Sequence, residues 1–169
     1  ATVRDTNEEK AISAEDQEFM ILESRFHSNP GIAIEQSKTA AKKMAEQSKT
    51  ALNLSFGLLD HFQEETAFRV EKIEAKVDRY EDELGTYLIK LNQKDLSLED
   101  SHSLSIMLHC IGDFERISDH ALSIMKSARE ISGKNASFSP KAVQELHVME
   151  KAVSDIVEKA YNVFANQDM

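Results

Sequence analysis

The sequence predicts an all-α protein that folds as an antiparallel bundle of long helices. Apolar residues recur every three or four positions over four long stretches, which is the period of a helix with one buried face. No stretch shows the strict polar–apolar alternation of a half-buried strand. The 169 residues include five Gly and two Pro, so turns are few and each element is long. Four long helices joined by short loops fold most simply as an antiparallel bundle.

Residues 1–28 are expected to precede the bundle, and residues 1–17 show no apolar period. Residues 1–17 are polar and acidic, a composition typical of a flexible segment. A small apolar cluster follows, formed by Phe19, Met20, Ile21, Leu22 and Phe26. We therefore divide the chain into a flexible acidic lead-in with a short apolar cluster at 1–28 and a helical bundle at 29–169.

The first two helices of the bundle are predicted at 30–61 and 65–91. Asn29 can cap a helix, and Pro30 is favoured at the first helical position because its missing N–H would be unbonded there anyway. One apolar stripe of the second helix is formed by Val70, Ile73, Val77, Tyr80, Leu84, Leu88 and Leu91. The polar run at 92–95 ends this stripe and predicts a loop.

The third and fourth helices are predicted at 98–132 and 140–166. Ser97 is a suitable N-cap, and Asp100 lies three residues later, where a capping box places its acidic partner. Gly133 is the expected C′ residue at the other end of the third helix, because glycine adopts the left-handed conformation without strain. The dipeptide at 139–140, Ser-Pro, repeats the cap-then-proline signal and opens the last helix.

The charge balance and the single cysteine exclude several classes of function. With 30 acidic and 20 basic residues the formal charge is −10, so we expect cations or basic partners and no nucleic acid. One Cys cannot form an internal disulfide, which indicates a reducing compartment. No stretch reaches the roughly 18 uninterrupted apolar residues of a membrane span.

The motifs of common enzymes are absent from the sequence. There is no His-Glu-x-x-His pair, no glycine-rich phosphate loop and no Gly-x-Ser-x-Gly elbow. A ferritin-like di-iron centre needs two Glu-x-x-His pairs and two further glutamates, and here only Glu99-x-x-His102 has that spacing. We therefore expect a protein that is not an enzyme.

Several acidic residues fall on the apolar faces of the second and third helices. On a helical wheel Glu115 lies between Leu104 and Leu108, and Asp119 lies one turn further on at the edge of the same face. The second helix places Glu81 within its apolar stripe, and beside it lie Glu74 and Asp78.

Each of these two helices thus bears a Glu-x-x-x-Asp pair with both members on one side. Antiparallel neighbours can bring the two pairs together, and crowded carboxylates require a cation, a proton or water. Oxygen ligands without a thiolate suit iron, manganese, magnesium, calcium or zinc. The alternative is that the acids are solvated and pair with nearby basic residues, namely Arg69, Lys72, Lys76, Arg79 and Arg116.

Three segments of the chain resemble known proteins. The segment at 113–121, DFERISDHA, resembles the signature helix of the PhoU family. The longer stretch at 77–121, beginning VDRYEDELGTY, is similar to the cytoplasmic PhoU-like region at the C-terminal end of bacterial sodium/phosphate cotransporters. The stretch at 29–44, NPGIAIEQSKTAAKKM, is similar to the opening of the first helix of that region.

The resemblance implies a fold and a set of site residues. PhoU-type repeats are three-helix units, so the chain is expected to contain one such repeat and the first helix of a second. In some members the acidic motifs of the second and third helices bind multinuclear iron or zinc clusters. The positions that match those motifs here are Glu74, Asp78, Glu115 and Asp119, and Glu81 matches a recurrent acid one turn beyond.

The resemblance also implies a function in phosphate homeostasis. The expected protein is a regulatory domain of a sodium-dependent phosphate transporter, on the cytoplasmic side of the bacterial inner membrane. Its expected partners are the membrane domain of that transporter, a second copy of the chain, or a signalling partner. The alternatives are a free-standing PhoU-like signalling regulator and a metal-free helical interaction module.

The chain departs from the family pattern in two ways. Ser118 stands where the family commonly has glycine before the last Asp of the third helix, and we expect it to add bulk close to the acids. The family usually shows two tandem repeats, whereas the run at 140–166 resembles only the first helix of a second repeat. We therefore expect a fragment or a truncated region, whose metal site is incomplete or is completed by a second chain.

Overall fold

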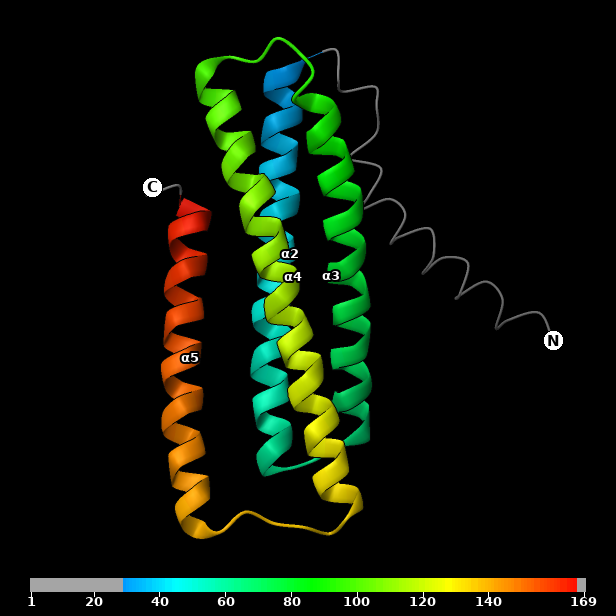
Figure 1. Cartoon of the computed structure of the whole chain (residues 1–169), viewed down its shortest axis with the longest axis vertical. Coiled ribbons are helices and arrows are strands. Elements are labelled where there is room, and N and C mark those ends of the chain that lie inside the picture. The colour runs from blue at the N-terminus through cyan, green and yellow to red at the C-terminus, as the bar shows by residue number, and fades with distance from the viewer. Residues whose placement is uncertain (1–28, 167–169) are drawn as a thin grey trace, which may run out of the picture.

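The computed structural model describes residues 29–166 as four long helices, with no strand in that range (Figure 1). They are α2 (Pro30–Asp60), α3 (Glu64–Leu91), α4 (Leu98–Gly133) and α5 (Pro140–Asn166). Successive helices run in opposite directions and are joined by short loops, as Figure 1 shows. The predicted all-α antiparallel bundle is confirmed, and every helix end lies within one residue of its expected position. The lead-in expected at 1–28 and its apolar cluster lie outside the described residues.

The predicted helix starts are confirmed by side-chain hydrogen bonds. The side chain of Asn29 accepts a hydrogen bond from the backbone N–H of Ile32. Ser97 accepts from the N–H of Asp100 at 3.0 Å and donates its hydroxyl to the Asp100 carboxylate at 2.8 Å. These contacts satisfy backbone donors that the first helical turn leaves without partners, and therefore fix where α2 and α4 begin.

The end of α4 differs from the prediction, because Asn135 and not Gly133 takes the C′ position. Gly133 is still helical, whereas Asn135 has a φ of 50°, in the left-handed region that asparagine tolerates. The N–H groups of Asn135 and Ala136 bond to the carbonyls of Ser132 and Ile131, which is the pattern of a Schellman motif. The C′ position thus lies two residues beyond Gly133, while the helix itself ends at Gly133, one residue past its expected end.

The core lies between α2, α3 and α4, which all contact one another. α3 and α4 contribute large apolar side chains such as Tyr80, Leu84 and Met125, all fully buried. α2 instead contributes a buried face that is rich in small residues. These are Ala33, Ser37, Ala40, Ala41, Ala45, Ser48, Ala51 and Ser55.

α5 lies on the outer side of this three-helix unit and packs chiefly against α2 (Figure 1). Its inner side places Val153, Val157 and Tyr161 against the core, and the ring of Phe164 meets that of Phe114 edge-on at 5.0 Å. Other apolar residues of α5 face outward: the exposed fraction is 72 % for Val148 and 67 % for Ile156. The arrangement is that of one three-helix repeat with a fourth helix attached to its first.

Replacing Ala41 by Leu is expected to lower the free energy of unfolding by about 1–3 kcal/mol, because the added atoms have no space on the face of α2 that meets the other helices. Thr39→Leu on the exposed side of the same helix is the matched control and should change stability little. Urea unfolding followed by circular dichroism measures both. Equal stabilities for the two variants would contradict close packing at this face.

Candidate metal centre

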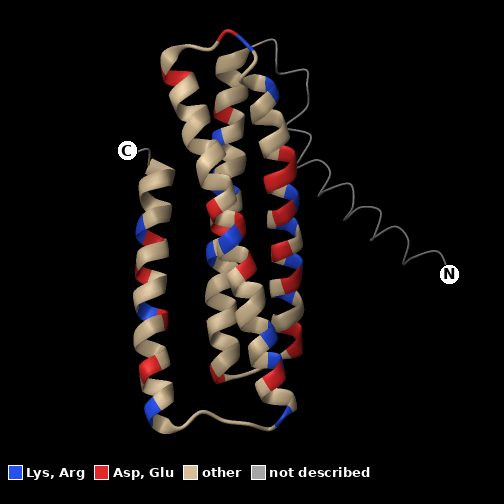
Figure 2. Cartoon of the chain, in the orientation of Figure 1, with Lys and Arg blue, Asp and Glu red and all other residues tan. Residues whose placement is uncertain are grey.

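The five predicted ligands lie on the two adjacent, antiparallel helices α3 and α4. Glu74, Asp78 and Glu81 occupy successive turns of α3, and Glu115 and Asp119 occupy successive turns of α4. The three glutamates are half-buried and the two aspartates are exposed. Figure 2 shows acidic and basic residues along α3 and around the middle of α4. We call these five residues the acid cluster.

Glu115 feels the charges of acids on both helices. Its pKa is raised above the ordinary value of 4.5, first by burial and then by the charge of the neighbouring Asp119 carboxylate. Glu81 and Asp78 on α3 raise the pKa of Glu115 further. The carboxyl of Glu115 is therefore close enough to α3 for acids of the two helices to repel one another.

Glu74 on α3 likewise feels the charge of an acid on α4. Its pKa is raised first by burial, then by Asp119 on α4 and Asp78 on α3, while the ammonium of Lys126 partly offsets this. Because Asp119 acts on both Glu74 and Glu115, the two Glu-x-x-x-Asp pairs form one electrostatic group across the helix interface.

The acid cluster fits a cation by its donor chemistry. The charge of Asp119 favours the protonated form of Glu115, and a cation can offset the same repulsion between the two carboxylates. The donors are all carboxylate oxygens, which hard cations prefer. Within residues 29–166, no three of these five carboxylates place oxygens within 4.8 Å of one another. Three of these carboxylates can therefore coordinate one ion only if their side chains rotate.

Several basic residues that were alternative partners for the acids contact other groups. Arg79 binds Glu83 at 2.7 Å, and Arg116 lies 3.9 Å from Asp113. The ammonium of Lys72 lies over the ring of Phe68. The partners in these contacts, Glu83, Asp113 and Phe68, are residues outside the acid cluster.

Ser118 lies in the core and not beside the exposed carboxylate of Asp119. Its side chain is buried, and its hydroxyl oxygen has no hydrogen-bond partner among the described residues. A step of 100° along the helix separates it from Asp119. The bulk that serine adds at this position is therefore accommodated by the packing of α4.

Glu99 and His102, whose spacing resembles half of a di-iron motif, line a different cavity of about 160 Å³. Lys38 and Lys42 of α2 line the same cavity, together with Phe164. Two ammonium groups disfavour a cation at this place, because like charges repel. The cavity is thus unsuited to a di-iron centre.

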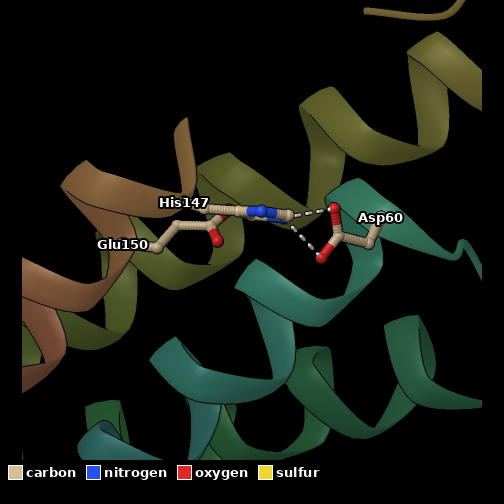
Figure 3. A group of neighbouring side chains, drawn as sticks. All are labelled: Asp60, His147 and Glu150. Carbon is tan, nitrogen blue, oxygen red and sulfur yellow. Dashed lines mark hydrogen bonds and ion pairs between the residues drawn. The ribbon is translucent and has the colours of Figure 1, made fainter. Parts of the chain in front are cut away.

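One group of possible ligands was missed by the sequence reasoning, namely Asp60, His147 and Glu150 (Figure 3). His147 and Glu150 are three residues apart on α5 and share a face of it. Asp60 is the last residue of α2, 87 positions before His147. The spacing within α5 was visible in the sequence, but nothing linked it to Asp60.

The stability of the metal-free protein is expected to fall as the pH rises above about 4.5. The folded pKa values of Glu74 and Glu115 are raised from 4.5, so the folded chain retains these protons at a pH where the unfolded chain has lost them. Ionisation of both groups therefore disfavours folding as the pH passes through the raised values. Urea unfolding in chelator across this range measures the slope.

Glu115→Gln should flatten that slope, because the amide has no charge to repel its neighbours. Glu46→Gln on the exposed side of α2 is the control and should retain the slope of the parent. An identical slope in Glu115→Gln and Glu46→Gln would contradict the repulsion at the acid cluster.

Comparison with known proteins places these helices in a family. The model of that family, described as the PhoU domain, matches residues 41–128, which is more than half of the chain and includes every residue of the acid cluster. No curated protein and no solved structure matches the chain. The match extends from the middle of α2 through α3 into the last turns of α4. On this evidence the chain belongs to the PhoU family.

Proposed function

We propose that the chain is a cytoplasmic regulatory domain of a sodium-dependent phosphate transporter, and that its acid cluster holds a metal. The observation that supports a metal best is the coupling of Glu115 on α4 to Asp78 and Glu81 on α3. Membership of the PhoU family supports a regulatory, non-enzymatic role in phosphate homeostasis.

Iron or zinc is the proposed occupant, held by Glu74, Asp78, Glu81, Glu115 and Asp119. The metal supplies positive charge that removes the repulsion among these carboxylates. Since the ligands come from two helices, the same charge joins α3 to α4 near the middle of the bundle. The residues thus provide a way for metal binding to alter the helix interface.

The transporter context rests on the similarity of 77–121 and 29–44 to the PhoU-like region of sodium/phosphate cotransporters. Among the helices at 29–166, none combines the length and the apolar character needed to cross a membrane. In this proposal the membrane domain of the transporter is the partner. A second copy of the chain or a signalling protein is a further proposed partner.

Membership of the family supports a free-standing PhoU-like regulator equally well. A metal-free interaction module is favoured by a different observation, namely the exposed apolar residues of α5 such as Val148 and Ile156. The experiments below separate these functions, because one concerns the metal and the other concerns sodium-dependent transport.

Untagged protein purified without chelator is expected to contain iron or zinc by elemental analysis. The double variant Glu115→Gln/Asp119→Asn should lose the share held by the acid cluster, because amides are far weaker ligands than carboxylates for these ions. Glu130→Gln/Asp113→Asn removes the same charge from exposed positions of the same helix and should retain the metal. Equal metal content in the two double variants would disprove the proposed ligands.

The regulatory role is tested by phosphate uptake in the source cell. Glu115→Gln/Asp119→Asn, introduced at normal expression, should abolish the dependence of sodium-driven uptake on phosphate supply, while Glu130→Gln/Asp113→Asn should preserve it. A change confined to sodium-independent uptake would favour the free-standing regulator over a transporter domain. Unchanged uptake of both kinds would contradict both.

A further inference from the structure

Asp60, His147 and Glu150 form a compact group between the end of α2 and the first half of α5. The Nε2 atom of His147 lies 2.9 and 3.1 Å from the two carboxylate oxygens of Asp60. One ligand atom from each residue lies within 4.8 Å of the other two. Figure 3 shows the imidazole extending toward Asp60, with the carboxylate of Glu150 beside the ring.

Glu150 indicates that this group is more than a surface ion pair. An ion pair of His147 with Asp60 accounts for two of the three residues, whose side chains are 50 % and 53 % exposed. The Oε1 atom of Glu150, in contrast, is buried and has no hydrogen-bond partner among the described residues. A buried carboxylate oxygen without a partner is costly, and a cation bound beside it offsets that cost.

The ligand types suit zinc, and so does the separation of His147 from Asp60. Zn²⁺ binds imidazole nitrogen and carboxylate oxygen at about 2.0–2.2 Å, and in a tetrahedral site two such ligands are about 3.3 Å apart. The nitrogen–oxygen separations of 2.9 and 3.1 Å are close to this value. Three protein ligands leave the fourth position to water, and the exposure of Asp60 and His147 gives water access.

We propose that Asp60, His147 and Glu150 bind one Zn²⁺ ion, which fastens α5 to the C-terminal end of α2. This site is independent of the acid cluster, which joins α3 to α4. Polar contacts elsewhere between α2 and α5 include the ion pair of Lys49 with Glu158 at 2.9 Å, the same ammonium 4.2 Å from the centre of the Tyr161 ring, and the hydrogen bond of Ser154 with Asn53 at 3.2 Å. The zinc adds bonds to three residues at the end where α5 begins.

The test titrates Zn²⁺ into the full chain bearing Glu115→Gln/Asp119→Asn, so that the acid cluster does not compete. Calorimetry should show one equivalent of zinc, and adding His147→Gln should weaken its binding by roughly tenfold or more, through loss of a ligand. His109→Gln, at an exposed histidine of α4, is the matched control and should bind as the parent does. Asp60→Asn should weaken binding as His147→Gln does. Circular dichroism verifies that each variant is folded.

Amide hydrogen exchange of α5 supplies the second measurement. Zinc should slow exchange along the first half of α5 in the parent and in His109→Gln, and should leave it unchanged in His147→Gln. Equal zinc affinity in His147→Gln and His109→Gln overturns the site. If the parent binds zinc and hydrogen exchange along α5 does not slow, the proposal that zinc fastens α5 to α2 is wrong.

Discussion

The structure depends on how closely α2 lets the other helices approach. α2 packs against each of the other three described helices, and α5 rests chiefly on it. Most residues of its buried face are alanine or serine, and each of the buried serine hydroxyls is satisfied within the helix. Ser37, Ser48 and Ser55 donate to carbonyls three or four residues earlier, at 2.7–3.0 Å. Small side chains allow the backbones of neighbouring helices to approach closely. The large residues of α3 and α4 fill the space that the small residues of α2 leave in the core. This packing determines the contact between α3 and α4, where the acid cluster lies.

The acid cluster lies at the border of that core, and its electrostatics follow from its position. The glutamates are half-buried because the apolar stripes of α3 and α4 meet beside them, and burial is the largest cause of the raised pKa of both Glu74 and Glu115. Neither position improves the packing, since Leu or Ala would fill it without repulsion. Groups that oppose folding in this way are common at functional sites, where a ligand compensates for them. A cation bound by these carboxylates would offset their repulsion, and this electrostatic reasoning is independent of the membership of the family.

The helices could be predicted from the sequence because their determinants are local. The apolar period, the Asn29 and Ser97 caps and the loops are each contained in a few successive residues. The same holds for the acid cluster, since four-residue spacing on two neighbouring helices suffices to align Glu74 with Asp78 and Glu115 with Asp119. The prediction of Gly133 as the C′ residue was wrong, because Asn135 tolerates the left-handed conformation and takes that position. Which of the two residues ends the helix depends on which carbonyls the N–H groups of the loop can bond. The grouping of Asp60 with His147 could not be predicted from the sequence, because the register of α5 against α2 is set by packing between residues that are far apart in the sequence.

α5 is the helix that separates from the bundle at the lowest cost in free energy. It contacts chiefly one neighbour, and many of its apolar residues face solvent, so little apolar area is exposed when it leaves. The ion pair of Lys49 with Glu158 is partly exposed and contributes little. The apolar anchor at the far end of α5 is the ring of Phe164 on that of Phe114. Phe114 is the residue before Glu115, so the release of Phe164 removes a packing partner from the same turn of α4 that bears a carboxylate of the acid cluster. Movement of α5 therefore changes the packing next to Glu115, and with it the burial that is the largest cause of the raised pKa of this residue.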